Sequence, residues 1–324
     1  MCSLDAEERR SSATAAASRV TLTVAICTRN RRESLLQAIR SIASQRSAVA
    51  WELLVVDNGS TDGSADSLRE LSKSFPVDLR LEHEGRAGLA FARNRAIECS
   101  RGENLIFIDD DVTCLPGWLD AYAKGFENES VSGIAGRILP RMPPGTPRWF
   151  LEILPSEIGG PTSRFDFGDE PIEIRSGSSL PPPFGANMGV RRALAVAAGG
   201  VRTDLGWGEE KMIPGEETEF FHRILERGGR LVYQPEAVLE HRIEKHRVTW
   251  EYYVDWHRGF GRASVRMRSD RTAAGRLRLG LKECNRFVGS SVKVLVNPAY
   301  SPRAIKGSRR RAKAQGRIAE LLGL

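Results

Sequence analysis

The sequence predicts an α/β protein in which helices wind around a parallel sheet. Apolar, β-branched runs alternate with segments of helical periodicity over roughly the first hundred residues, and three of these runs end in a cluster of polar residues. The chain has 324 residues, enough for one large α/β domain with an appended segment or for two smaller domains. Hydrophobic residues make up 41% and charged residues 27%, which is ordinary for a globular protein.

The first predicted strand covers residues 20–27 and follows a small, polar segment, residues 1–19, that we expect to be disordered. Thr28 and Asn30 after this strand are expected to cap a helix. That helix is indicated by apolar residues at helical spacing, namely Leu35, Leu36, Ile39 and Ile42.

A second strand is predicted over residues 51–56, and the turn that follows it is expected to cap a helix through Leu68 and Leu71. Further along, the pattern predicts a short strand over 79–82, a turn over 85–88, a helix over 89–99 and a buried strand over 104–108. The last of these strands ends on three consecutive aspartates, Asp109, Asp110 and Asp111.

Polar clusters follow three of the predicted strands. They are Thr28-Arg29-Asn30, Asp57-Asn58-Gly59-Ser60 and Asp109-Asp110-Asp111. Ligands of wound parallel sheets bind beyond the carboxyl ends of the strands, so we expect these clusters to converge in space.

The pattern loosens in the second half of the chain. Residues 140–183 are rich in Pro and Gly and are interpreted as a long loop or lid. Regular secondary structure is expected to resume over residues 184–191. It is followed by an acid-capped helix over 216–227, a strand over 230–233 and helices from residue 250 onward. The C-terminal part is predicted to be amphipathic, with one apolar face made of Leu277, Leu281, Cys284 and Val288.

Charge divides the chain into a basic end and a mildly acidic body. Residues 255–324 contain 17 Lys or Arg and four Asp or Glu, a net charge of +13, whereas the whole chain carries +7 and the remainder therefore −6. We expect the basic end to meet an anionic surface such as a membrane leaflet. The alternative is a solvated, partly disordered end.

The five cysteines are scattered, odd in number and without a CxxC pair, which favours a reducing cytosol. We expect no signal peptide and no membrane span, because no apolar run reaches the required length. The expected location is therefore cytoplasmic, with peripheral attachment at the inner face of the membrane.

The aspartate triplet has two interpretations. Three adjacent carboxylates repel one another, and a divalent cation such as Mg²⁺ or Mn²⁺ would relieve this repulsion. The alternative is an acidic turn that caps the next helix. The position at the end of a predicted sheet strand favours the metal site.

Glu216, Glu217 and Glu219 begin the predicted helix after Gly215. One interpretation is that these acids only complement the helix dipole, and the other is that one of them is a general base. His241 is in a segment that permits metal ligation through a neutral imidazole, although a lone histidine is more often structural.

Arg86, Arg93 and Arg95 flank the start of the helix predicted over residues 89–99, where arginines suit a diphosphate. The alternative is a charged outer helix face. The sequence has no GxxxxGK[ST] phosphate loop, no GxSxG elbow and no nucleic-acid-binding motif, so we expect no nucleic-acid partner.

Taken in order, these segments resemble the family 2 glycosyltransferases. The resemblance extends over roughly residues 20–245. It is carried by four sequence segments, VAICTRNR from Val24, VVDNGSTD from Val55, GLAFARN from Gly88 and IDDD from Ile108, and by FGANM from Phe184 and the pair Glu216-Glu217.

The resemblance implies a GT-A fold, with a Rossmann-like mixed sheet flanked by helices over residues 20–250 and a basic helical extension over residues 251–324. It also implies site roles. Donor and nucleotide contacts fall on Thr28, Arg29, Asn30, Asp57, Asn58, Gly88, Arg93, Asp109, Asp110 and Asn187. Metal ligands fall on Asp111, Asp109 and His241.

The resemblance places the catalytic base at Glu217, where the family usually has Asp. Because glutamate has a longer side chain, Glu216 and Glu219 are alternatives. The implied activity is an inverting, metal-dependent transfer of a hexosyl or related sugar from a nucleoside-diphosphate sugar to a hydroxyl of a glycan or lipid-linked acceptor, in cell-surface glycan or glycolipid synthesis. UDP is the default nucleotide, with dTDP and GDP as alternatives.

Two other functions are compatible with the same residues. One is a nucleotidyltransferase on a related α/β fold, which would more often open with a Gly-rich triphosphate loop. The other is a non-catalytic sugar-nucleotide or glycan-binding protein, suggested by glutamate at the position of the base.

Overall fold

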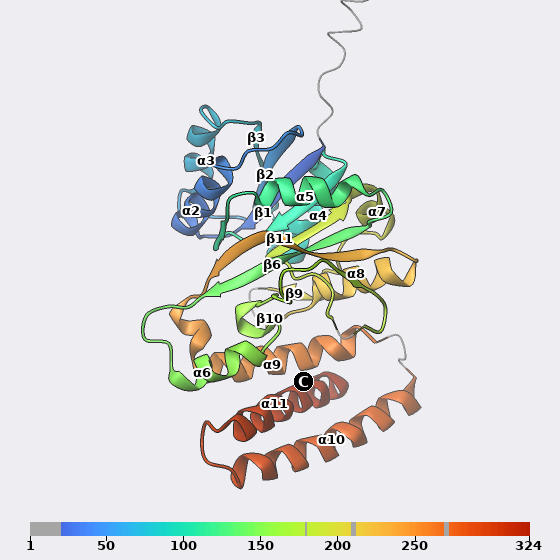
Figure 1. Ribbon diagram of the computed structural model, residues 1–324. Helices are drawn as coiled ribbons and strands as arrows, with labels where there is room; N and C mark the ends of the chain where they lie inside the picture. The colour runs from blue at the N-terminus through green and yellow to red at the C-terminus, as the bar shows by residue number, and fades with distance from the viewer. Residues whose placement is uncertain (1–20, 179, 209–211, 269–271) are drawn as a thin grey trace, which may run out of the picture.

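A mixed sheet is at the centre of the computed structural model, which describes residues 21–178, 180–208, 212–268 and 272–324 (Figure 1). The predicted tail of residues 1–19 lies outside the described residues. Within them, nine strands form the sheet. These are β1 (Leu22–Thr28), β2 (Trp51–Asp57), β3 (Leu79–His83), β4 (Asn104–Ile108), β5 (Val112–Cys114), β6 (Gly133–Arg141), β7 (Ile172–Ile174), β8 (Asn187–Arg191) and β11 (Leu231–Arg242).

The strand order is β3-β2-β1-β4-β8-β6-β11-β5, with β7 also paired to β11. The first four strands of this order are parallel, as the alternating pattern predicts. β8 then runs antiparallel to both β4 and β6. The sheet is therefore mixed, and the parallel sheet predicted from the pattern alone is confirmed only for this half. A separate two-stranded sheet joins β9 (Gly206–Trp207) to β10 (Met212–Ile213).

Seven α-helices are described before the C-terminal part, and most of them pack against the sheet. They are α2 (Arg32–Ala43), α3 (Ser64–Ser72), α4 (Leu89–Cys99), α5 (Trp118–Glu127), α6 (Arg148–Ile153), α7 (Arg192–Ala197) and α8 (Glu216–Glu226). On α2, for example, Leu35, Ile39 and Ile42 are buried at the predicted helical spacing. Helix α6 packs instead on the segments Leu154–Ser156 and Pro302–Leu322. The bounds of α4 and β4 coincide with the predicted ones.

The predicted helix caps are wrong. Helix α2 follows Arg31, and its first amide, that of Arg32, donates to Asp62 Oδ2 at 2.8 Å. Thr28 is still in β1, and Asn30 binds the loop after β2. Helix α3 follows Gly63 rather than the 57–60 turn. Composition identified the turns, but the side chains of these turns bind neighbouring loops instead of the next helix.

Residues 140–183 are more ordered than the predicted long loop. They contain α6, the short 3-10 helices η1 (Leu154–Ser156) and η2 (Gly160–Thr162), and strand β7. The strand predicted over 230–233 extends as β11 to Arg242, so His241 lies within a strand and not after one. Its buried position follows from the pairing of β11 with both β6 and β5.

In the described C-terminal residues, 250–268 and 272–324, three helices follow the sheet: α9 (Trp250–Arg266), α10 (Ala273–Leu295) and α11 (Pro302–Leu322). Helix α9 packs against β10, η2 and the 3-10 helix η3 (Lys245–Val248), and α11 lies between α9 and α10 (Figure 1). Gly316 allows the close crossing of α9 and α11, because a side chain there would collide with the Arg258 carbonyl. None of the described helices has the length and hydropathy needed to span a membrane.

Candidate functional site

The three polar strand ends meet, as the sequence predicts. The Thr28 hydroxyl at the end of β1 donates a hydrogen bond to Asp110 Oδ2 at 2.7 Å. The Asn58 amide after β2 donates to the Thr28 carbonyl at 2.9 Å. Side chains that are about thirty and eighty residues apart in the chain thus share one edge of the sheet, because the parallel strands present their carboxyl ends together.

A possible metal-binding group lies at this edge. One potential ligand atom each from Asp109, Asp111 and His241 lie within 4.8 Å of one another. Asp109 and Asp111 come from the turn after β4, and His241 comes from β11 beside β5. Carboxylate and imidazole ligands in this number suit Mn²⁺ and related divalent ions.

The hydrogen bonds of His241 support a cation at this place. Its Nδ1 lies 2.9 Å from the Thr162 carbonyl, which can only accept, so Nδ1 is protonated. Its Nε2 faces Asp111 Oδ1 at 3.2 Å. This buried oxygen has no hydrogen-bond partner among the described residues. Arg247 Nη1 lies 3.3 Å from the same Nε2, so this nitrogen faces both a carboxylate and a guanidinium. An Nδ1–H bond to a carbonyl is the usual support of a metal-ligating histidine.

His241 and Asp111 shift each other's pKa in opposite directions. Burial lowers the pKa of His241, but the Asp111 carboxylate raises it more, and the net shift is upward. The pKa of Asp111 is well below its usual range, because His241, Arg247 and Arg31 outweigh its burial. A metal ion bound here would compete with a proton for Nε2 of His241.

Asp110 has a structural role beside this group. Its carboxylate accepts from Thr28 and forms an ion pair with Arg31 Nε at 2.8 Å, and its carbonyl accepts from the Ser34 hydroxyl. Burial raises the pKa of Asp110 to about 7, although Arg31 opposes this shift. Asp110 therefore ties β4 to β1 and α2.

A cavity of about 430 Å³ opens over the strand ends, and we call it the strand-end cavity. It is lined by Cys27, Thr28, Arg29, Arg31, Asn58, Gly88, Leu89, Ala92, Asp109, Asp110, Asp111, Trp207, Gly208, His246, Arg247 and Tyr252. Most of the residues predicted to contact the donor are in this lining. Four of them, Asn30, Asp57, Arg93 and Asn187, are not.

Asn30 and Asp57 shape the loops around the strand-end cavity. Asn30 has a positive φ of 53°, and its side-chain oxygen accepts from the Thr61 amide at 2.7 Å. Asp57 Oδ1 accepts from the Ser60 amide at 3.1 Å. Both side chains fasten the loop after β2, and their contact with the donor stays a prediction.

Asn58 and Gly88 form the opposite rim. The Asn58 side chain donates to the carbonyls of Glu84 and Arg86 and accepts from the Gly88 amide at 2.9 Å. Gly88 has a φ of +133°, which favours glycine, and a side chain there would approach the Trp207 carbonyl. Asn58 thus holds the turn that closes this side of the cavity.

The placement of Asn187 in the core contradicts the prediction that it contacts the donor. Its side chain is fully buried, and Oδ1 accepts from Trp118 Nε1 and the Tyr122 hydroxyl, both at 2.9 Å. Its Nδ2 donates to the carbonyls of Arg137 and Ala237. All of its hydrogen-bonding capacity is used in the core, which the sequence alone could not show.

Of the three arginines near α4, Arg86 and Arg95 face outward, whereas Arg93 faces the site. Arg86 pairs with Glu84, and Arg95 pairs with Glu82, and neither arginine lines the strand-end cavity, which favours the alternative of a charged outer helix face. Arg93 points inward and is buried. It forms an ion pair with Glu216 at 2.5 Å and lies 3.5 Å from Asp109 Oδ1.

The three acids at the start of α8 have different surroundings. Glu216 is buried and held by Arg93 and by the Gly215 amide. Glu219 is paired with Arg223, at 2.9 Å. Glu217 is 16% exposed, and among the described residues its nearest cation is Arg93 at 4.0 Å. Burial and the Glu216 charge raise the pKa of Glu217 to about 8.

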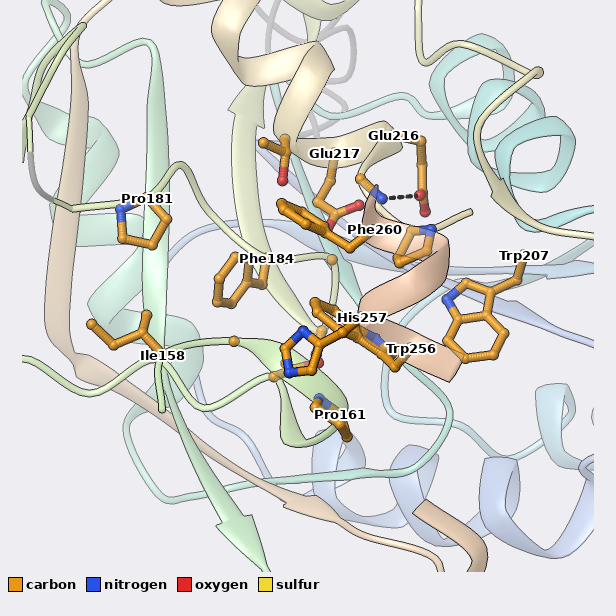
Figure 2. Close-up of a pocket in the computed structure, with 18 of the residues that line it drawn as sticks. Ile158, Pro161, Pro181, Phe184, Trp207, Glu216, Glu217, Trp256, His257 and Phe260 are labelled. Carbon is orange, nitrogen blue, oxygen red and sulfur yellow. Dashed lines mark hydrogen bonds between the residues drawn. The ribbon is translucent and has the colours of Figure 1, made fainter. Parts of the chain in front are cut away.

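A second cavity, of about 330 Å³, lies between the start of α8 and α9 (Figure 2). We call it the α9 cavity. Asp109, Arg93, Glu216 and Glu217 line one side of it. The other walls comprise Leu89, Glu157, Ile158, Gly159, Gly160, Pro161, Ser163, Pro181, Phe184, Gly185, Ala186, Trp207, Pro214, Gly215, Thr218, Arg247, Tyr252, Trp256, His257, Phe260, Arg309 and Lys313.

The two cavities adjoin. Asp109, Trp207, Arg247, Tyr252 and Leu89 line both of them. Sequence reasoning missed the contribution of α9, although Tyr252, Trp256 and Phe260 recur every four residues and so share one helix face. That aromatic spacing was the available signal.

Comparison with known proteins agrees with this geometry. The family model described as glycosyl transferase family 2 matches residues 23–194, slightly more than half of the chain. The chain is 25% identical over 241 residues to the glucosyl-dolichyl phosphate glucuronosyltransferase of Haloferax volcanii, covering 72% of each chain. It is 26% identical over 233 residues to the succinoglycan biosynthesis protein ExoM of Rhizobium meliloti, covering 70% of this chain and 68% of that one.

Among solved structures, the mannosyltransferase PcManGT of Pyrobaculum calidifontis, in complex with GDP-Man and Mn²⁺, is similar with a TM-score of 0.55 and 20% identity. The alignment covers 95% of this chain and 75% of that chain. This likeness confirms the GT-A fold. With the family match and the sheet topology, it leads to one conclusion: the chain is a glycosyltransferase that belongs to glycosyl transferase family 2.

Proposed function

We propose that this protein transfers a sugar from a nucleoside-diphosphate sugar to a hydroxyl acceptor in a single, inverting displacement, in the synthesis of a cell-surface glycan or glycolipid. The observation that carries the proposal is the meeting of two cavities at Asp109. One cavity has the possible metal group, and the other has an incompletely paired carboxylate, Glu217. A donor in the strand-end cavity would place its anomeric carbon near this junction.

Asp109, Asp111 and His241 would hold a divalent metal ion, for which Mn²⁺ and Mg²⁺ are the candidates. When bound, such an ion neutralises charge on a departing diphosphate. The chain itself positions these ligands, because Thr162 orients His241 and Arg31 and Arg247 hold Asp111. The solved mannosyltransferase with GDP-Man and Mn²⁺ supports this assignment.

Glu217 would act as the general base. It lines the α9 cavity, and in the part of the chain that the structure describes it has no ion-pair partner closer than Arg93 at 4.0 Å, whereas Glu216 and Glu219 are both engaged. The acceptor hydroxyl would give its proton to Glu217 as its oxygen bonds to the anomeric carbon. The bond from that carbon to the diphosphate oxygen breaks, and the diphosphate leaves with the electron pair. Attack from the opposite face inverts the configuration.

Product analysis tests this proposal. A panel of UDP-, GDP- and dTDP-sugars with Mn²⁺ or Mg²⁺ is first screened by thermal shift, because a ligand of the native state raises the melting temperature. Turnover of the stabilising donor should release the free nucleoside diphosphate. Release of pyrophosphate would indicate the nucleotidyltransferase instead, and binding without turnover on any acceptor would indicate the non-catalytic binding protein.

The pH dependence of the reaction should reflect Glu217. Its pKa is raised to about 8, mainly by burial and secondly by Glu216, while Arg93 opposes the shift. A base works in its ionised form, so kcat/KM should rise with pH between about 7 and 9. Asp109, Arg247 and His257 line the same cavity, so the profile is compared between wild type and Glu217→Gln. An unchanged rise in that variant would assign the titration to another group.

We also propose that α10 attaches the protein to the cytoplasmic face of an anionic membrane. Its outer face is apolar and exposed, whereas the opposite face packs on α11 through Glu283 and Arg317 (Figure 1). Arg278, Lys282 and Lys293 are exposed on the same helix. The exposed apolar residues are Leu277, Leu281, Val288, Val292 and Leu295, at 51–82%. Such a helix suits an anionic interface.

Vesicle flotation checks this attachment. Wild type should float with vesicles that contain phosphatidylglycerol and much less with neutral phosphatidylcholine vesicles. The double variant Leu277→Ser, Leu281→Ser should lose most of this binding, because both side chains are on the outer face of α10. The control Leu151→Ser, Val196→Ser removes two equally apolar, exposed side chains elsewhere and should float like wild type. Equal flotation of both variants would contradict the assignment.

A further inference from the structure

The wall of the α9 cavity formed by α9 and α11 is basic and has no role in the chemistry proposed above. It contains His257 from α9 and Arg309 and Lys313 from α11. Figure 2 shows His257 next to Trp256 on the α9 ribbon, with Phe260 near Glu217. The basic side chains therefore line the same cavity as the proposed catalytic base.

His257 is a buried polar side chain that lacks a partner. It is 2% exposed, and neither ring nitrogen has a hydrogen-bond partner among the described residues. Tyr253 and Trp256 contact its ring edge to face, with centroids at 4.6 and 5.0 Å. Buried polar groups are nearly always hydrogen-bonded, so an unpaired imidazole in the wall of a cavity indicates a ligand that supplies the partner.

Lys313 is the second unpaired group. Its ammonium lies 4.7 Å from the centroid of the Phe260 ring, and within the described parts of the chain no salt bridge to it is found. The nearby acid Glu157 is already engaged by Arg309, at 2.5 Å, and by the Tyr253 hydroxyl. Burial, followed by Arg309 and Arg317, lowers the pKa of Lys313 to about 8.

A bound anion would supply the partner that His257 and Lys313 each lack. It would accept hydrogen bonds from Lys313 and from an N–H of His257, and it would offset the positive charge that Arg309 adds to this wall. The aromatic rings of Trp256 and Phe260 beside these groups offer apolar surface to the rest of the same ligand. A cavity of about 330 Å³ admits a ligand of monosaccharide size.

We propose that the α9 cavity binds an acceptor that has a phosphate group, and that Lys313 and His257 hold this phosphate while the acceptor hydroxyl faces Glu217. This inference rests on the proposed transferase function and specifies its acceptor class. The phosphate could belong to a lipid-linked sugar or to a free sugar phosphate, and both sources share the recognition chemistry.

Binding to the full-length protein, without donor, tests the phosphate subsite. The probes are glucose, galactose and mannose, each as the free sugar, the 1-phosphate and the octyl phosphodiester, titrated by calorimetry. Phosphorylated probes should bind about 10- to 100-fold more tightly than the free sugar, the range expected for hydrogen bonds to a charged group. Tighter binding of the diester than of the 1-phosphate would indicate a lipid-linked acceptor, and the reverse a free sugar phosphate.

Three variants make the test specific. Lys313→Gln should lose most of the preference for phosphorylated probes, and Lys313→Arg should restore much of it. Lys306→Gln removes an exposed lysine of the same helix that does not line the cavity, and it should keep the preference. His257→Gln is the second variant and should weaken binding of the phosphorylated probes without affecting binding of the free sugars.

The proposal is overturned if no phosphorylated probe binds better than its free sugar, or if Lys306→Gln has the same effect as Lys313→Gln. Nucleoside diphosphate binding with Mn²⁺, measured separately on the same variants, reports on the strand-end cavity. Retained nucleotide binding with no phosphate preference would refute this subsite alone. If wild type binds no nucleoside diphosphate in the presence of Mn²⁺, the transferase function itself is refuted.

Discussion

Glu217→Gln should lower kcat by about 10²- to 10⁴-fold, the usual contribution of a general base. Glutamine has the size of glutamate but cannot accept the hydroxyl proton. Of the three acids at the start of α8, Glu217 is the one that lines the α9 cavity without a close ion pair. Replacing it also removes the repulsion between two neighbouring carboxylates, so the variant should be at least as stable as wild type at pH 8 and above.

The measurement is initial-rate kinetics with the donor found in the thermal-shift screen. Glu226→Gln is the matched control, because Glu226 is on the same helix but exposed and outside the cavity. It should retain wild-type turnover. Glu217→Gln should keep nucleotide binding, since Glu217 does not line the strand-end cavity. Near-normal kcat in Glu217→Gln would transfer the role of base to Glu216 or to a group outside α8.

Asp111→Asn should abolish metal-dependent binding of nucleoside diphosphate and reduce turnover by about three orders of magnitude, because charge stabilisation by a metal ion is worth several kcal/mol. An amide is a weaker ligand than a carboxylate and carries no charge. The variant should also be less stable, because Arg31 and Arg247 lose their common anion, to which Arg31 Nη2 lies at 2.9 Å and Arg247 Nη2 at 3.6 Å.

Asp110→Asn separates the loss of metal binding from the loss of stability. Asp110 is a buried neighbour that binds Thr28 and Arg31 but does not contact His241. Both variants remove a carboxylate that faces Arg31, but only Asp111→Asn should lose the increase in melting temperature that Mn²⁺ produces in the presence of nucleoside diphosphate. An equal Mn²⁺ response in both would remove Asp111 from the metal group, as would full wild-type turnover in the presence of a chelator.

Much of the sheet half of the fold could be predicted from local pattern. Strand β4 and helix α4 have the predicted bounds, because a short apolar run and a helical apolar stripe each select one backbone conformation. Strand β11 was predicted too short. Its continuation to Arg242 includes Pro235 and a register shift between Gln234 and Val238, which interrupt the local strand signal.

The sequence could locate the candidate site, but it could not tell which predicted residues line the cavity and which are buried in the core. The order of the polar clusters placed Thr28, Asn58 and Asp109 at one edge of the sheet, where the structure has them. The same reasoning could not tell Asn58, which lines the cavity, from Asn187, which is saturated with hydrogen bonds in the core. Asn58 directly follows β2 and Asn187 is the first residue of β8. The two asparagines differ in the residues from distant segments that contact their side chains.

The sequence by itself determined the family, the parallel half of the sheet and the grouping of acids with a histidine, since these depend on residue types and on their order along the chain. The tertiary structure decided which acids are available. Arg93 from α4 engages Glu216, Arg223 engages Glu219, and Glu217 is left facing the cavity. It also brought α9 and α11 to the site. Burial and charge pairing arise between segments far apart in the chain, so no local pattern could have shown them.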